Sequence, residues 1–269
     1  MITGAGLRSG AAWGLALAAL LVMTPNARAQ DARAQGQQCA APREAKSLEH
    51  APLHVRDRIA KGLPLKIVAI GSSSTFGTGA SSPDMTYPSR LQAELKARLP
   101  GLPITVLNKG IGGEEAQQMV VRFDADVLDE APDLVIWQVG SNSVLANHDA
   151  PGNIVREGIE RLKASGTDVI LMNQQFAPRI LDKGERALHA VDVVTATARD
   201  TEVGLFNRFA TMRFWHDDES LGFEKFVTPD GLHMNDWGYG CIAKLLAAEL
   251  LDGAKLPIVT SGAASTAIK

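Results

Sequence analysis

Short apolar runs alternate with amphipathic stretches along most of the chain, and this alternation predicts strands that alternate with helices. Five segments are short, apolar and often β-branched, as expected for strands buried on both faces of a sheet. They are Leu65–Ile70, Pro103–Asn108, Asp133–Gly140, Thr167–Asn173 and Val203–Phe209. The predicted helices are Tyr87–Leu99, Glu114–Glu130, Asn153–Ser165, Glu185–Arg199 and Asp236–Leu251. Strict alternation of β and α units predicts an α/β domain whose parallel five-stranded sheet has helices on both faces.

The first residues of the chain have the layout of a cleaved secretory signal. Arg8 precedes a short apolar run, Ala11–Met23, and Ala27-Arg28-Ala29 has the small-x-small pattern of a cleavage site. The run is shorter than the roughly 20 residues that a membrane span needs. We therefore expect residues 1–29 to be removed rather than retained as an anchor, which gives a periplasmic or secreted protein with no stable membrane insertion.

The rest of the chain divides by composition. Residues 30–58 are polar and predict a loosely ordered N-terminal arm, residues 59–253 hold the alternating elements of one domain, and residues 254–269 predict a frayed C-terminal tail. The formal net charge is −3, and without the two arginines of the signal 25 basic and 30 acidic residues remain. No basic patch with interleaved aromatics is present, so we expect no nucleic-acid partner.

The chain has two cysteines, Cys39 and Cys241. In an oxidising compartment such a pair favours one disulfide that pins the polar arm to the domain, the alternative being two separate thiols. The run His216–Glu219 contains metal-ligand residue types, but charge runs of this kind are usually solvated. We expect no metal and no cofactor.

Polar segments follow the predicted strands, at the sheet edge where ligands bind in this architecture. The sequence GSSSTFG follows the first strand, NKGIGGEE the second and VGSNS the third, and TPDGLHMN precedes the last helix. A phosphate-binding loop closes on a lysine followed by serine or threonine, which neither GSSSTFGTG nor GIGGEE contains. The glycines at 71, 77 and 79 do not have the dinucleotide-binding spacing. The segments therefore favour an activated side chain over a nucleotide site.

A serine becomes a nucleophile only beside a base that a third group orients. His233 lies three residues after Asp230, across a glycine turn, so the carboxylate can bind Nδ1 and leave Nε2 free as the base. The alternative is a turn whose aspartate only caps the chain. Gly113 and Asn142, at the second and third strand ends, are suited to donate hydrogen bonds to an oxyanion. The other histidines are most simply interpreted as solvated or structural residues: His50, His54, His148, His189 and His216.

Together these segments resemble the four blocks of the SGNH superfamily of hydrolases, also called GDSL-type esterases and lipases. The blocks match Gly71–Gly77, Asn108–Gly113, Gly140–Asn142 and Asp230–His233. The resemblance selects Ser73 as the nucleophile, with Asp230 and His233 as its partners. It implies an oxyanion hole formed by the Ser73 and Gly113 N–H groups and the Asn142 amide.

The resemblance also implies a three-layer α/β/α flavodoxin-like fold and metal-free ester hydrolysis. Two positions depart from the family pattern, because Ser72 and Ser143 stand where the family usually has aspartate. We expect both serines to support their loops by hydrogen bonding.

An exported enzyme of this kind is expected to remove O-acyl groups, such as acetyl, from a carbohydrate through an acyl-enzyme. A lysophospholipase or thioesterase is the alternative within the enzyme class, and a non-catalytic glycan-binding domain is the alternative outside it. No lid-like apolar insertion is present, which argues against bulky triglycerides. Five aromatic residues are either stacking faces for a sugar or core: Trp137, Trp215, Trp237, Phe176 and Phe214.

Overall fold

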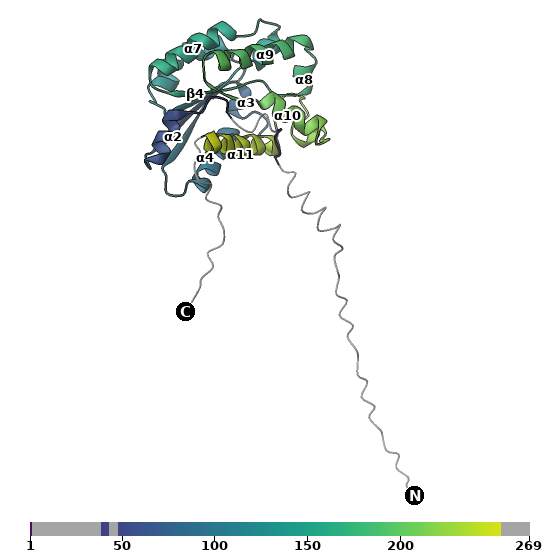
Figure 1. Ribbon diagram of the computed structural model, residues 1–269. Helices are drawn as coiled ribbons and strands as arrows, with labels where there is room; N and C mark the ends of the chain where they lie inside the picture. The colour runs from purple at the N-terminus through teal and green to yellow at the C-terminus, as the bar shows by residue number, and fades with distance from the viewer. Residues whose placement is uncertain (2–38, 43–47, 254–269) are drawn as a thin grey trace. The chain divides into compact units, whose positions relative to one another are not determined.

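Five parallel strands form one sheet, in the order β2-β1-β3-β4-β5. The sheet lies between two layers of helices (Figure 1). The strands are β1 Leu65–Gly71, β2 Ile104–Gly110, β3 Leu134–Gln138, β4 Asp168–Met172 and β5 Gly204–Phe206. Every neighbouring pair of strands is parallel, and the order is that of flavodoxin-like sheets. The predicted α/β class and parallel five-stranded sheet are confirmed.

A computed structural model of the chain describes residue 1, residues 39–42 and residues 48–253. The expected signal segment 1–29, apart from its first residue, and the expected tail 254–269 lie outside the described residues. So does the part of the N-terminal arm that precedes residue 39.

Two apolar clusters fill the space on either side of the sheet, because successive side chains of a strand point to opposite faces. Along β1, Ile67 and Ala69 belong to one cluster, whereas Val68 and Ile70 belong to the other. The helices α4 Tyr87–Arg98 and α11 Asp236–Gly253 cover the first face, and α7 Gly152–Ala164 and α9 Glu185–Asp200 cover the second (Figure 1). The three-layer arrangement follows from this alternation.

The remaining α-helices among the described residues are short. They are α2 Leu53–Ala60, α3 Ser73–Phe76, α5 Ala116–Val121, α6 Ser141–Ala146, α8 Pro178–Leu181 and α10 Arg208–Asp217. One π-helical turn and two 3-10 turns complete the set: Asp124–Leu128, Pro83–Met85 and Phe223–Lys225. Several of these helices begin directly after a strand, at the carboxyl edge of the sheet.

Several sequence-based boundaries are wrong, and capping explains two of them. The helix predicted over Glu114–Glu130 begins only at Ala116, because the Glu115 and Gln118 side chains form a capping box. The helix predicted to reach Glu130 also stops early, since α5 ends at Val121 and a π-helical turn follows at Asp124–Leu128. The strand predicted to reach Phe209 ends at Phe206, because the Asn207 side chain accepts a hydrogen bond from the Ala210 N–H and starts α10. Phe209 still enters the core, but from a helix.

The described part of the N-terminal arm packs against the domain. Cys39 and Cys241 form the disulfide that the sequence favours, with their Cα atoms 4.8 Å apart. The Trp215 indole N–H donates to the Ala40 carbonyl at 2.6 Å. The end of the expected loose arm is instead helical, since α2 starts at Leu53 and its Val55 N–H donates to Asp168.

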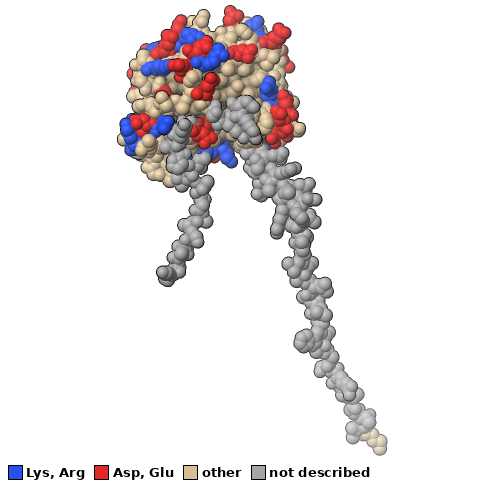
Figure 2. All heavy atoms as spheres, in the orientation of Figure 1, with Lys and Arg blue, Asp and Glu red and all other residues tan. Residues whose placement is uncertain are grey.

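Acidic and basic side chains are interspersed on the face that carries α7 and α9 (Figure 2). Arg156 of α7 and Asp200 of α9, for example, approach to 3.5 Å. Within the described ranges, no helix combines the length and hydrophobicity needed to cross a membrane.

A buried carboxyl group in α11 makes the stability of the fold depend on pH. Glu249 is 4% exposed, and burial, reinforced by nearby Asp252, raises its pKa to about 9. The folded state therefore keeps a proton that the unfolded chain releases near pH 4.5, so stability falls as pH rises from about 4.5 to 9. We expect Glu249→Gln to raise the free energy of unfolding at pH 8 by about 2–4 kcal/mol.

Urea unfolding near pH 5 and near pH 8 measures this effect. The gain should be much larger at the higher pH, because only there does the wild-type carboxyl group favour the unfolded chain. Glu160→Gln, which changes an exposed acid of α7, is the matched control. A gain of the same size at both pH values would contradict the assignment to Glu249.

Candidate active site

The turn between β1 and α3 presents Ser73 at the carboxyl edge of the sheet. Gln138, at the end of the neighbouring strand β3, is 1% exposed. Its Oε1 accepts from the Ser72 N–H at 2.9 Å, the Ser72 hydroxyl at 3.0 Å and the Thr75 hydroxyl at 3.3 Å. This one buried acceptor fixes the turn. Ser73 begins α3, so its own N–H has no acceptor within the helix and points outward.

His233 and Asp230 meet Ser73 from the loop before α11. His233 Nε2 lies 2.9 Å from the Ser73 Oγ, and His233 Nδ1 lies 2.5 Å from the Asp230 Oδ2. The other carboxylate oxygen, Oδ1, accepts from the Thr228 hydroxyl and from the Leu232 and His233 N–H groups at 2.7–3.0 Å. The loop thus holds the carboxylate by three donors, while the carboxylate holds the imidazole through its other oxygen.

These hydrogen bonds keep Asp230 ionised. Its partial burial acts to raise the pKa, but the donors from His233, Thr228 and Leu232 outweigh burial and hold the pKa well below its usual range. An ionised carboxylate only accepts hydrogen bonds, so His233 Nδ1 must carry the proton. Nε2 is then free to accept from the Ser73 hydroxyl.

The loop between β2 and α5 lies beside Ser73. A Cβ built on Gly112 would lie 4.0 Å from the Ser73 Cβ. Gly113 has φ +84° and, among the described residues, no atom within 4 Å of where its Cβ would be. Glycine is therefore favoured at 113 by its left-handed backbone conformation.

Asn142 is the second residue of the short helix α6. Its amide Nδ2 donates to the Glu114 carbonyl at 2.7 Å. This bond ties the start of α6 to the loop that carries Gly113, and it leaves the second amide proton of Asn142 available to a ligand.

Both serines that depart from the family pattern make the supporting hydrogen bonds expected of them. Ser72 donates to Gln138, as described above. The Ser143 hydroxyl donates to Glu115 Oε2 at 2.9 Å, and the other oxygen of Glu115 lies 2.8 Å from His148 Nδ1. Serine therefore substitutes for the usual aspartate by pairing with a glutamine or a glutamate.

A close contact between β2 and α3 was not recognised from the sequence. A Cβ on Gly110 would lie 2.1 Å from the Phe76 backbone nitrogen, so only glycine lets α3 rest on the end of β2. Asn108 reinforces the contact, since its Nδ2 donates to the Phe76 carbonyl at 3.3 Å. The position of Ser73 thus depends on β2 as well as β1.

A buried arginine behind the site, Arg208, was not predicted from the sequence either. Arg208 is fully buried, and it donates to the Asn173 carbonyl at 3.0 Å and to Gln175 Oε1 at 2.9 Å. Gln175 in turn donates to the Leu232 carbonyl at 3.3 Å, directly before His233. Burial lowers the pKa of Arg208 to about 10. The only signal in the sequence is the polar run that follows β4.

The other candidates raised by the sequence lie elsewhere. Trp137 and Trp215 are core residues with at most 1% exposure. His54 pairs with Asp133 at 3.2 Å, at the start of β3 and therefore at the opposite end of the strands. His216 stacks on Phe223. In the part of the chain that the structure describes, no group of three or more acidic, histidine or cysteine side chains is arranged to hold a metal.

A flavodoxin-like sheet with serine, histidine and aspartate linked in series at its carboxyl edge is the arrangement of SGNH-type serine hydrolases. The chain belongs to the non-GDSL lipase-like family, whose model matches residues 38–256.

Individual relatives are more distant. An acetylxylan esterase of Geobacillus stearothermophilus is 35% identical over 81 residues, which are 30% of this chain and 34% of the esterase. The fold resembles that of a two-domain esterase active on acetylated mannans, with a TM-score of 0.67 at 24% identity over 82% of this chain and 59% of that one. It also resembles a lipolytic protein of the G-D-S-L family from Desulfitobacterium hafniense, with a TM-score of 0.58 at 21% identity over 69% and 99%. The matched parts thus span about a third of the acetylxylan esterase and three-fifths of the two-domain esterase.

Proposed function

We propose that the protein is an exported serine esterase that removes acetyl or other short acyl groups from a carbohydrate. The observation that carries this proposal is the hydrogen-bonded series from Ser73 through His233 to Asp230. Such a series gives a serine hydroxyl a base, and gives that base an orienting carboxylate. Membership of a lipase-like family agrees with ester hydrolysis.

The proposed reaction begins when His233 Nε2 takes the proton of Ser73 as Oγ attacks the ester carbonyl. Asp230 stabilises the imidazolium through Nδ1. The Ser73 and Gly113 N–H groups and the Asn142 amide donate to the tetrahedral oxyanion, where losing one donor typically costs about 3–4 kcal/mol of barrier.

His233 then gives its proton to the departing alcohol oxygen, and the acyl group remains on Ser73 Oγ. Water, deprotonated by His233, attacks this acyl-enzyme. The second tetrahedral intermediate collapses to release the carboxylic acid, and the proton returns from His233 to Ser73. No cofactor enters the scheme.

Two comparisons favour a carbohydrate as the carrier of the ester. One is the acetylxylan esterase that is 35% identical over part of the chain, and the other is the fold shared with an esterase active on acetylated mannans. Two catalytic mutants of Axe2, an acetylxylan esterase of Geobacillus stearothermophilus with the same fold, replace an aspartate and a histidine three positions apart. Asp230 and His233 have the same spacing.

Export is part of the proposal. The layout of residues 1–29 is that of a secretory signal, and the Cys39–Cys241 disulfide suits an oxidising compartment. The mature protein then consists of the arm from residue 30, the hydrolase domain over residues 59–253 and the tail. Fractionation of a cell that expresses the full chain, with N-terminal sequencing of the product, tests the cleavage near Ala29.

A substrate comparison tests the activity. The mature protein is assayed for acid release from acetylated xylotetraose, acetylated mannotetraose, a lysophosphatidylcholine and an acyl thioester. The proposal predicts the highest kcat/KM on an acetylated oligosaccharide. Preference for the lysophospholipid or the thioester would assign the protein to those enzymes, and binding of oligosaccharide without release of acid would assign it to the glycan-binding modules.

A further inference from the structure

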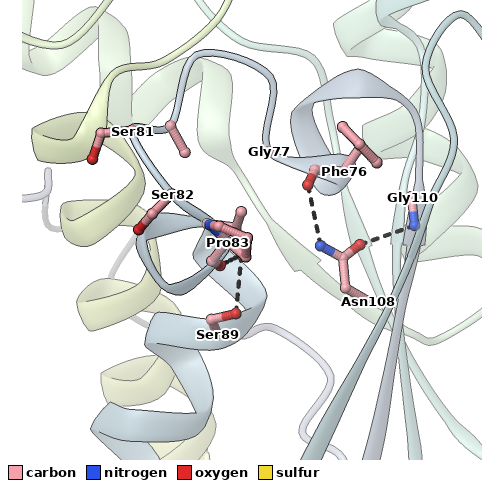
Figure 3. A pocket seen from close by; sticks show the side chains of 10 residues that line it. Phe76, Gly77, Ser81, Ser82, Pro83, Ser89, Asn108 and Gly110 are labelled. Carbon is pink, nitrogen blue, oxygen red and sulfur yellow. Dashed lines mark hydrogen bonds between the residues drawn. The ribbon is translucent and has the colours of Figure 1, made fainter.

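A hollow of about 580 Å3 lies beside the helix that carries Ser73 (Figure 3). Phe76 and Asn108 stand on one side of it, and Ser82, Pro83 and Ser89 stand on the other. The volume falls within the roughly 300–1,000 Å3 that small-molecule sites occupy. The hollow is therefore large enough to hold part of a substrate.

The hollow is adjacent to the reacting atoms through α3. Phe76 follows Ser73 by three residues in this helix, and residues three apart share one face of a helix. Gly110, which also lines the hollow, is in close contact with the α3 backbone and ends the strand that leads to Gly113. The loop that forms the opposite wall lies against the site, since a Cβ built on Gly79 would lie 3.2 Å from the His233 Cβ. The hollow itself is lined by none of the proposed oxyanion donors Ser73, Gly113 and Asn142.

The lining combines one aromatic face with hydrogen-bonding groups. The Phe76 side chain is 61% exposed. The Thr86 hydroxyl has one proton and lies 2.9 Å from the Pro83 carbonyl and 3.2 Å from the Ser89 hydroxyl, so the Ser89 oxygen keeps a lone pair that can accept from a ligand. Asn108 uses Oδ1 for the Gly110 N–H and one amide proton for the Phe76 carbonyl, which leaves its second amide proton.

This combination suits a sugar ring better than an acyl chain. A pyranose has an apolar face of C–H groups that packs on an aromatic ring, and hydroxyl groups around its edge that pair with serine and asparagine. An acyl chain in the same place would cover those polar groups without giving them partners, which is costly.

The wall opposite Phe76 is held in place before any ligand binds. The Ser81 N–H and hydroxyl both donate to the Asp236 carboxylate, at 2.8 and 2.6 Å. The Tyr239 hydroxyl donates to the Thr78 carbonyl at 2.7 Å. Both anchors are in α11, so the loop between α3 and α4 needs little ordering when a ligand enters.

We propose that this hollow binds the sugar ring that bears the ester, with Phe76 as the specificity-determining residue that stacks on it. The inference rests on the proposed esterase function and adds the site of the leaving alcohol. In this proposal the segment between Phe76 and Ser89 determines the preference for a glycan ester over other esters, whereas Ser73, His233 and Asp230 perform the hydrolysis.

The test compares two substrates in one set of variants. Phe76→Ala should lower kcat/KM for acetylated mannotetraose or xylotetraose roughly tenfold more than for 4-nitrophenyl acetate, the effect of losing one stacking contact worth about 1.4 kcal/mol. Phe76→Trp, which keeps a ring, should retain the preference. Leu53→Ala, an exposed apolar residue of α2, should leave both values unchanged. Equal losses on the two esters in Phe76→Ala would overturn the inference, because they would show a structural effect on α3.

A binding measurement separates this inference from the proposed function. Saturation-transfer NMR of Ser73→Ala with mannotetraose and xylotetraose that carry no acetyl groups should show sugar binding, and adding Phe76→Ala should abolish it. Sugar binding by a protein whose wild type hydrolyses no ester would contradict the proposed function and support the sugar site. Hydrolysis of 4-nitrophenyl acetate by a protein that binds neither sugar would keep the esterase and overturn the sugar site.

Discussion

His233→Ala is expected to lower kcat by about 10^4–10^6-fold, on small and on glycan esters alike. Without the imidazole, Ser73 has no base within hydrogen-bond reach, and the departing alcohol has no proton donor. The assay is hydrolysis of 4-nitrophenyl acetate at saturating substrate, corrected for the uncatalysed rate. His189→Ala, which removes an exposed imidazole from α9, should retain wild-type kcat.

The losses of kcat caused by replacing Ser73 and His233 should not multiply, because both residues act in the same step. Ser73→Ala and the double variant Ser73→Ala/His233→Ala should each be about as slow as His233→Ala, because the base has no role once the nucleophile is gone. A double variant that is slower by the product of the two single losses would contradict a shared step. Unchanged melting temperatures in the three variants would show that the losses are chemical.

Loss of the Cys39–Cys241 disulfide is expected to lower the free energy of unfolding by about 3–5 kcal/mol. The bond joins residues 202 positions apart, so it restricts the unfolded chain across almost the whole domain. Urea unfolding of Cys39→Ser/Cys241→Ser against the oxidised wild type measures the difference. Activity at low temperature should persist, since neither cysteine takes part in the hydrogen bonds that link Ser73, His233 and Asp230.

Reduction of the wild type provides the internal control for the disulfide. Reduced wild-type protein should unfold at the same urea concentration as the double cysteine variant, and the variant itself should not respond to reductant. Equal stability of oxidised and reduced wild type would contradict the prediction, and would mean that the arm contributes nothing to the fold beyond its noncovalent contacts.

The strands and long helices followed from the sequence because their signals are local. Continuous apolar runs gave β1 to β4 within about two residues of their observed bounds, and leucines at helical spacing gave α4. The short helices did not follow, since α3 and α6 are fixed by contacts between segments. Gln138 holds the start of α3 from a different strand, and Asn142 binds the loop before α5.

Part of the candidate site could be predicted from the sequence, because its signals are also local. Asp230 and His233 are three residues apart, and a parallel sheet collects its strand ends at one edge, so their meeting with Ser73 could be anticipated. Arg208 and Phe76 could not. Arg208 acts through two intermediaries across the core, and Phe76 is identified as an exposed aromatic only once the packing of α3 on β2 is known.

An activated hydroxyl at Ser73 should react with a fluorophosphonate, whereas an ordinary serine hydroxyl should not. The most direct measurement is intact mass after treatment of the mature protein with a fluorophosphonate probe, in the wild type, Ser73→Ala and Ser74→Ala. We predict one covalent adduct in the wild type and in Ser74→Ala, and none in Ser73→Ala. A folded wild type that forms no adduct, or an adduct that survives in Ser73→Ala, would contradict the account.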